Sequence, residues 1–158
     1  MSVNFSNTIP AAPAGSTNVK WQTDGSGNLS AYVTSAVELT GDGFDGTAQA
    51  ANIALTNLIA SPTSGRYRIS AYIIVTQAAT TSSTLPSISL QWNDADNGQA
   101  QTFALTPTDT GNLLTTSHFN DVFLSVGASS PLTFSTSGYT SVGATPMQFA
   151  IHITVEAL

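Results

Sequence analysis

The chain has 158 residues and only 12 charged ones, three basic and nine acidic, which gives a net charge of −6. Three basic side chains are too few to neutralise the phosphates of a nucleic acid or to hold a chain on an anionic membrane. Apolar residues make up 41% of the chain and can form a core, whereas the absence of cysteine excludes disulfides and thiolate metal sites. The composition therefore predicts one packed domain that binds no nucleic acid, membrane or cofactor.

The first 40 residues differ from the rest of the chain. They include a run of small residues with two prolines, which favour extended chain. Residues 19–23 and 29–33 then flank a glycine-containing loop and predict a short β-hairpin. Because an isolated hairpin is only marginally stable, we expect residues 1–40 to form an N-terminal arm that docks onto another protein, with Trp21 and Tyr32 as its anchors.

From residue 41 onward, alternating apolar and polar residues predict strand after strand. The pattern is clearest at 66–76 and 147–156, where every second residue is apolar. Shorter strands are predicted at 87–93, 100–106 and 132–136. Residues 49–60 would permit an amphipathic helix, but the neighbouring strands favour a strand there. Seven or eight short strands joined by turns indicate an all-β domain over 41–158, an antiparallel β-sandwich or jelly roll.

Residues 117–126 carry apolar side chains on both faces of the predicted strand, with Phe119 and Phe123 together on one of them. A strand that is apolar on both faces is buried on both faces. In a single sandwich domain, one such face meets another subunit. We therefore expect Phe119 and Phe123 to form inter-subunit contacts, together with Tyr72 and Ile74 from the strand at 66–76.

Two of the three basic residues, Arg66 and Arg68, share a strand face with Tyr72. Two interpretations remain open for them. The guanidinium groups either pair with carboxylates of a neighbouring subunit or lie on a solvated face.

Signatures of catalysis are nearly absent. The two histidines, His118 and His152, fall at the head of one strand and on the polar face of the last one. The serines include no G-x-S-x-G nucleophile elbow, and a triad needs three positioned groups. We therefore predict that the protein is not an enzyme and that both histidines are solvated or lie at an interface.

Two short segments, 40–46 and 94–98, each contain a pair of aspartates and end in glycine. The second resembles the first half of a calcium loop, but Leu105 stands where the closing glutamate should be. Because Asp, Asn and Gly also suit tight turns, we predict turns at both segments, with divalent-ion binding as the alternative. Trp92 beside Asn93 could stack on a sugar, although it also continues the predicted core face of its strand.

Residues 9–22 and 27–33 resemble an N-terminal arm that recurs in structural proteins of tailed bacteriophages. Residues 64–72, followed later by 137–139 and 146–150, resemble β-sandwich domains of phage heads or tails, and the layout is similar to trimeric tumour-necrosis-factor and C1q jelly rolls. The resemblance implies a virion protein made in the host cytoplasm, of the capsid decoration or head or tail fibre type. It also implies a homotrimer that contacts the major capsid protein or other virion proteins.

The composition is consistent with this interpretation. Serine and threonine together contribute 43 residues, and such an uncharged surface leaves few charges to be desolvated where subunits pack. The alternative function is a β-sandwich module that binds carbohydrate or a host receptor, with a host surface glycan as its partner.

Overall fold

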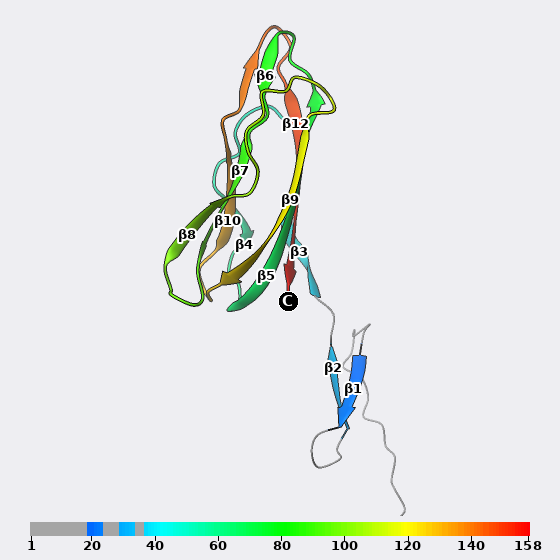
Figure 1. Cartoon of the computed structure of the whole chain (residues 1–158), viewed down its shortest axis with the longest axis vertical. Coiled ribbons are helices and arrows are strands. Elements are labelled where there is room, and N and C mark those ends of the chain that lie inside the picture. Colours follow the sequence, from blue (N-terminus) through cyan, green and yellow to red (C-terminus); the bar gives the residue numbers. More distant parts are fainter. Residues whose placement is uncertain (1–18, 24–28, 34–36) are drawn as a thin grey trace, which may run out of the picture. The chain divides into compact units, whose positions relative to one another are not determined.

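The computed structural model describes the backbone of residues 19–23, 29–33 and 37–158, and the side chains of residues 43–158 (Figure 1). The described segments contain twelve strands and no helix, so none of them includes a helix that could cross a membrane. The chain forms two compact units, Met1–Ala36 and Val37–Leu158. The division predicted after residue 40 falls inside the first strand of the second unit.

The first unit contains the predicted hairpin. Strands β1 (Val19–Thr23) and β2 (Leu29–Val33) pair antiparallel, with Val19 opposite Val33. The predicted anchors Trp21 and Tyr32 lie in these strands, but their side chains are outside the described residues. Their role in docking stays a prediction.

The second unit is built from two four-stranded antiparallel sheets and one small two-stranded sheet. Its strands are β3 (Val37–Gln49), β4 (Thr56–Ile59), β5 (Gly65–Gln77), β6 (Ser82–Thr84), β7 (Ser87–Asn93), β8 (Ala100–Ala104), β9 (Ser117–Val126), β10 (Leu132–Ser137), β11 (Thr140–Val142) and β12 (Gln148–Ala157). One large sheet has the order β3-β12-β5-β9 and the other β4-β10-β7-β8, while β6 pairs with β11.

The strand order is that of a jelly roll. Counted in chain order within the two large sheets, the first strand pairs with the last, and the second pairs with the second to last. Each sheet is then completed by strands from the middle of the chain, so consecutive strands repeatedly cross from one sheet to the other. This arrangement confirms the predicted all-β antiparallel sandwich.

The core lies between the two large sheets and follows the period-two pattern. Five alternate residues of β5 and four of β12 are buried: Tyr67, Ile69, Ala71, Ile73, Val75, Phe149, Ile151, Ile153 and Val155. Across the core, Phe134 of β10 packs against Phe44 of β3 with the ring centroids 4.7 Å apart. The predicted inward faces of both long strands are therefore confirmed.

Other sequence-based predictions need correction. Of the strand expected at 49–60, only Gln49 at the end of β3 and Thr56–Ile59 are in strands, and Ile53 between them instead exchanges hydrogen bonds with Thr136 of β10 through its N–H and carbonyl. The segment 40–46, predicted as a turn, lies within β3. The strand predicted at 100–106 ends at Ala104, and its Phe103 is 40% exposed because β8 is an edge strand.

Glycine explains how the segment 40–46 can be a strand despite its turn-like composition. Gly43 has a φ angle of +124°, which few other residues adopt, and lies opposite Thr154 in the ladder with β12. A Cβ at this position would meet the carbonyl oxygen of Ile153. The register of β3 against β12 therefore depends on the absence of a side chain at Gly43.

Replacing Gly43 by alanine tests this close approach. Because the new Cβ would meet a backbone carbonyl and the φ angle is unfavourable, Gly43→Ala should lower the free energy of unfolding by about 1–3 kcal/mol in urea denaturation. Gly65→Ala is the matched control, since a Cβ on Gly65 would have no neighbour within 4 Å. Equal losses in the two variants would contradict this explanation.

Candidate functional site

The outer face of the β3-β12-β5-β9 sheet carries most of the predicted interface residues. Side chains alternate across a strand, so the residues between the buried positions of β5 and β9 point away from the core. We call the surface formed by Arg66, Arg68, Tyr72, Phe119 and Phe123 the aromatic face. Along this face, β9 pairs with β5 from Ser117, which lies opposite Ile74, to Ser125, which lies opposite Arg66.

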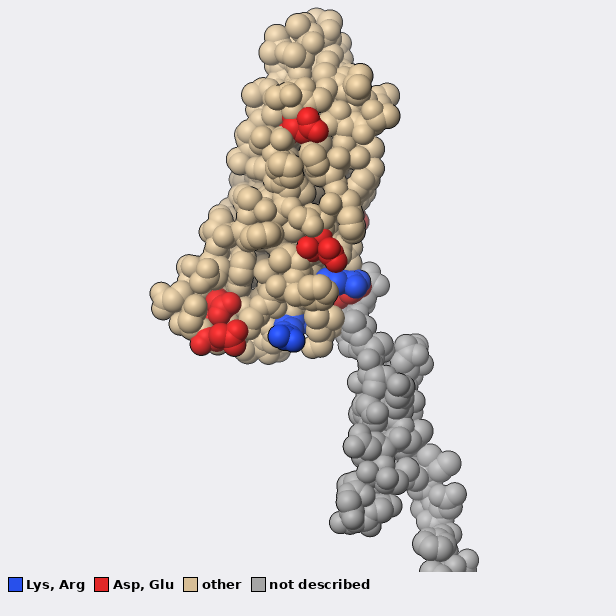
Figure 2. Space-filling view, viewed as in Figure 1, with Lys and Arg blue, Asp and Glu red and all other residues tan. Residues whose placement is uncertain are grey.

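The phenylalanines of β9 are open to solvent in the single chain. Phe119 is 68% exposed and Phe123 is 65% exposed, and the neighbouring Tyr72 is 37% exposed. Burial of β9 on both faces, which the sequence predicts, therefore does not occur within one chain, where only Leu124 and Val126 on the inner face are buried. Ile74 is half-buried. Figure 2 shows few charged atoms on the side of the domain that it displays, most of them gathered in the lower half of the view.

One row across the aromatic face joins four strands. Phe119 of β9 lies opposite Tyr72 of β5, which lies opposite His152 of β12, which lies opposite Asp45 of β3. The Tyr72 and His152 rings are nearly parallel, with an interplanar angle of 14° and centroids 6.4 Å apart. His152 Nδ1 and Asp45 Oδ1 are 2.6 Å apart and form a hydrogen bond. The row thus combines three rings with one carboxylate.

The two arginines of β5 have different surroundings. Arg68 forms an ion pair within the chain, with its Nη2 2.7 Å from Oε2 of Glu156 on β12. Arg68 therefore has a partner within the chain but is still 41% exposed, and its pairing with another subunit stays a prediction. Arg66 forms no ion pair with any residue whose side chain the structure describes.

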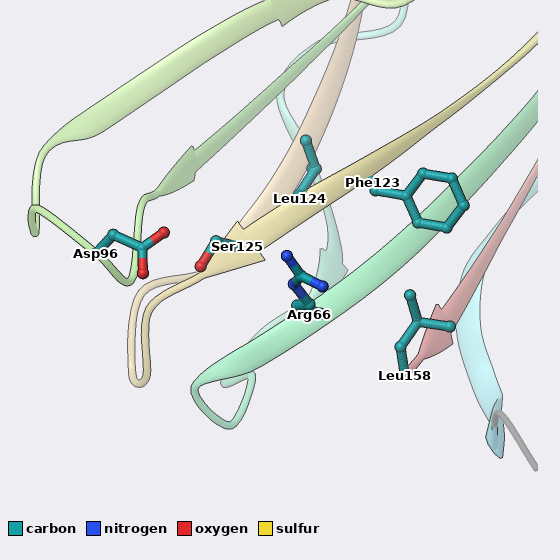
Figure 3. A pocket seen from close by; sticks show the side chains of 6 residues that line it. All are labelled: Arg66, Asp96, Phe123, Leu124, Ser125 and Leu158. Carbon is teal, nitrogen blue, oxygen red and sulfur yellow. The ribbon is translucent and has the colours of Figure 1, made fainter.

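A hollow of about 480 Å³ lies at the Arg66 end of the aromatic face. It is lined by Arg66, Asp96, Phe123, Leu124, Ser125 and Leu158 (Figure 3). Figure 3 shows the guanidinium of Arg66 beside Ser125, with the Phe123 ring and the Leu158 side chain on one side and Asp96 on the other. The sequence offered no sign of this hollow, because its lining comes from four separate parts of the chain.

The predicted turn at 94–98 is confirmed, and its chemistry is local. Asp94 Oδ1 accepts hydrogen bonds from the N–H groups of Asp96 and Asn97, and the Asp94 carbonyl accepts one from Gly98. Among the residues whose side chains are described, no cluster of three or more His, Asp or Glu residues could hold a metal ion. The carboxylate of Asp94 thus shapes the loop that carries Asp96 to the hollow.

The remaining candidates lie away from the aromatic face. His118 of β9 has its Nε2 3.5 Å from Oδ2 of Asp109, and the nitrogen is buried without a hydrogen-bond partner. Trp92 is partly buried against the core, and it also lines a surface depression together with Asn93, so the sugar-stacking alternative stays open. A shallower depression of about 220 Å³ beside β7 and β8 is lined by neutral residues, among them Gln91.

No family model matches the chain, and no curated protein matches it. Among solved structures, the chain is similar to endo-1,4-beta-D-xylanase 10B of Clostridium thermocellum, in a structure of its CBM22-1 and GH10 modules with xylohexaose. The identity is 15% and the TM-score 0.38, over 78% of this chain and 24% of that chain. The present chain thus corresponds to less than a quarter of that chain's length.

The Arg68–Glu156 ion pair can be tested by a double-mutant cycle. Because the two side chains are 41% and 23% exposed, solvent screens them, and we expect a coupling energy of about 0.2–1 kcal/mol between Arg68→Leu and Glu156→Gln. The cycle is measured by urea denaturation of the four proteins. Arg66→Leu with Glu156→Gln is the control cycle and should show no coupling. Coupling of the same size in both cycles would contradict the assignment of Arg68 as the partner.

Proposed function

We propose that the protein is a structural component of a tailed-bacteriophage virion, a capsid decoration or head or tail fibre protein that assembles as a homotrimer. The observation that carries the proposal is the exposure of Phe119 and Phe123 beside Tyr72 on one sheet face. Contiguous exposed aromatic surface is a mark of protein–protein contact. The aromatic face is the proposed subunit interface, and catalysis has no part in this function.

The free energy gained by burying the three exposed rings can be compared with the cost of association. Three rings exposed to this degree offer on the order of 300 Å² of apolar surface. At about 25 cal/mol per Å², their burial contributes roughly 7 kcal/mol. Association itself costs about 4–15 kcal/mol, so the rings supply a large part of the driving force and the polar neighbours on the face have to complete it.

The virion assignment rests on the sequence resemblance and agrees with the architecture. Jelly rolls occur in viral capsid domains, and they also occur in lectins, so the fold alone does not establish the function. The chain divides into a small N-terminal unit and a sandwich. In this proposal, residues 1–40 dock onto the major capsid protein or another virion protein through Trp21 and Tyr32, and the sandwich forms the trimer.

The second candidate function is a carbohydrate- or host-receptor-binding module. It is favoured by the row in which the Tyr72 and His152 rings lie next to the Asp45 carboxylate, since sugars stack on rings beside hydrogen-bonding groups. The neutral depression beside β7 and β8 would suit an uncharged ligand as well. A host surface glycan is the partner in this case.

Light scattering after size-exclusion chromatography tests the trimer. Three chains of 16.3 kDa should give a particle of about 49 kDa, and replacing both phenylalanines (Phe119→Ser with Phe123→Ser) should shift the mass to that of one chain. Leu113→Ser is the matched control, because Leu113 is 67% exposed but lies in the loop before β9. A wild-type monomer at micromolar concentration would refute the trimer and favour the glycan-binding alternative.

The docking of the arm is tested in virions. The double variant Trp21→Ser with Tyr32→Ser should retain the fold of the sandwich, as judged by its thermal melt, but should be depleted at least about tenfold from purified particles, as measured by quantitative mass spectrometry. Deletion of residues 1–35 should give the same depletion. Unchanged incorporation of both proteins would disprove docking through the arm.

A further inference from the structure

Arg66 is the one basic side chain in the described part of the chain that lacks an ionic partner. Arg68, on the same face, is held by Glu156 at 2.7 Å, and the third basic residue, Lys20, lies outside the residues whose side chains are described. In a protein with nine acidic and three basic residues, an unpaired guanidinium is uncommon. The side chains around it limit which chemical groups it would accept.

The hollow around Arg66 suits a carboxylate that is attached to an apolar segment. The Phe123 ring and the Leu158 side chain, 65% and 58% exposed, stand beside the guanidinium and would shield an ion pair from water (Figure 3). An arginine presents a rigid fork that binds a carboxylate through two parallel hydrogen bonds. The site thus fits an acidic residue flanked by aromatic or aliphatic side chains.

The chain itself contains such a segment. Asp121 lies on β9 between Phe119 and Phe123, and all three alternate onto the outer face. Its carboxylate has no ionic or hydrogen-bond partner among the described residues. The other described side-chain carboxylates except Asp96 have partners: Asp45 binds His152, Glu156 binds Arg68, and Asp94 and Asp109 bind backbone N–H groups.

Within one chain, Arg66 and Asp121 are too far apart to pair. Arg66 lies opposite Ser125 in the register of β5 with β9, and Asp121 is four residues away from Ser125 along the same strand. At about 3.3 Å per residue, this separation is roughly 13 Å. Phe123 lies midway between them. A second copy that contacts the exposed Phe123 through its own β9 can therefore bring its Asp121 over Arg66.

We propose that Arg66 of one subunit binds Asp121 of a second copy of this chain, with Phe123 and Leu158 closing the pair off from solvent. This inference rests on the proposed homo-oligomer and names the polar contact that completes its aromatic interface. It explains why an arginine without a partner stands beside the most exposed rings of the sheet. It also predicts that self-association weakens as the salt concentration rises.

Charge reversal tests the pair in the full-length protein. Arg66→Glu and Asp121→Arg should each raise the dissociation constant of the oligomer at least about tenfold, because each places like charges opposite one another. The double variant, Arg66→Glu with Asp121→Arg, should recover the wild-type value to within about threefold, since it restores an opposite pair. Dissociation constants are measured by sedimentation equilibrium at two salt concentrations, and a thermal melt confirms that each variant folds.

A matched control distinguishes Asp121 from the carboxylate on the other side of the hollow. Arg66→Glu with Asp96→Arg should not restore association; if it does while the Asp121 double variant does not, Asp96 is the partner and the proposal is wrong. Failure of both double variants to associate would also overturn it. Arg66→Gln, a neutral change, should abolish the salt dependence, and an unchanged salt dependence would contradict the pair. A monomeric wild-type protein would instead refute the proposed function itself.

Discussion

The two-residue alternation of β5 is the constraint on which the rest of the domain depends. One set of its side chains, from Tyr67 to Val75, forms the centre of the core, and the other set, from Arg66 to Tyr72, forms the middle of the aromatic face. A slip of one residue would exchange the two faces. The same register that packs the core therefore decides which side chains lie on the outer face. A change of register that altered the core would also alter the aromatic face.

The edges of this sheet show how the face is completed. At one edge, β3 is able to pair with β12 because Gly43 brings no side chain against the backbone, and this pairing carries Asp45 to His152. At the other edge, β9 presents Phe119 and Phe123. A long edge strand with exposed aromatic side chains invites pairing with another chain, and proteins usually cover or charge such an edge. Here the sequence leaves it uncharged except at Asp121, which is consistent with a surface made for a defined partner.

Much of the fold follows from the sequence. The strands at 66–76, 87–93, 132–136 and 147–156, the hairpin of the first unit and the sandwich class are all apparent from periodicity and turn residues, because each depends on local patterns. The composition of the segment 40–46 predicts a turn, because glycine and aspartate favour turns, but the segment is part of β3, where it pairs with β12. The partner of Arg68 and the lining of the hollow could not be found from one sequence, because Glu156, Asp96 and Leu158 come from distant parts of the chain.

The sequence by itself determined that the domain is all-β, poor in charge, and apolar on both faces of the strand at 117–126. Local alternation and composition are sufficient for each of these statements. Only the tertiary structure decided that Phe119 and Phe123 are exposed in the single chain, that Arg68 is paired, and that Arg66 is free among the described residues. The physical reason is that exposure and ion pairing depend on the register between strands far apart in the chain, and strand pairing is settled by the whole core rather than by any one segment.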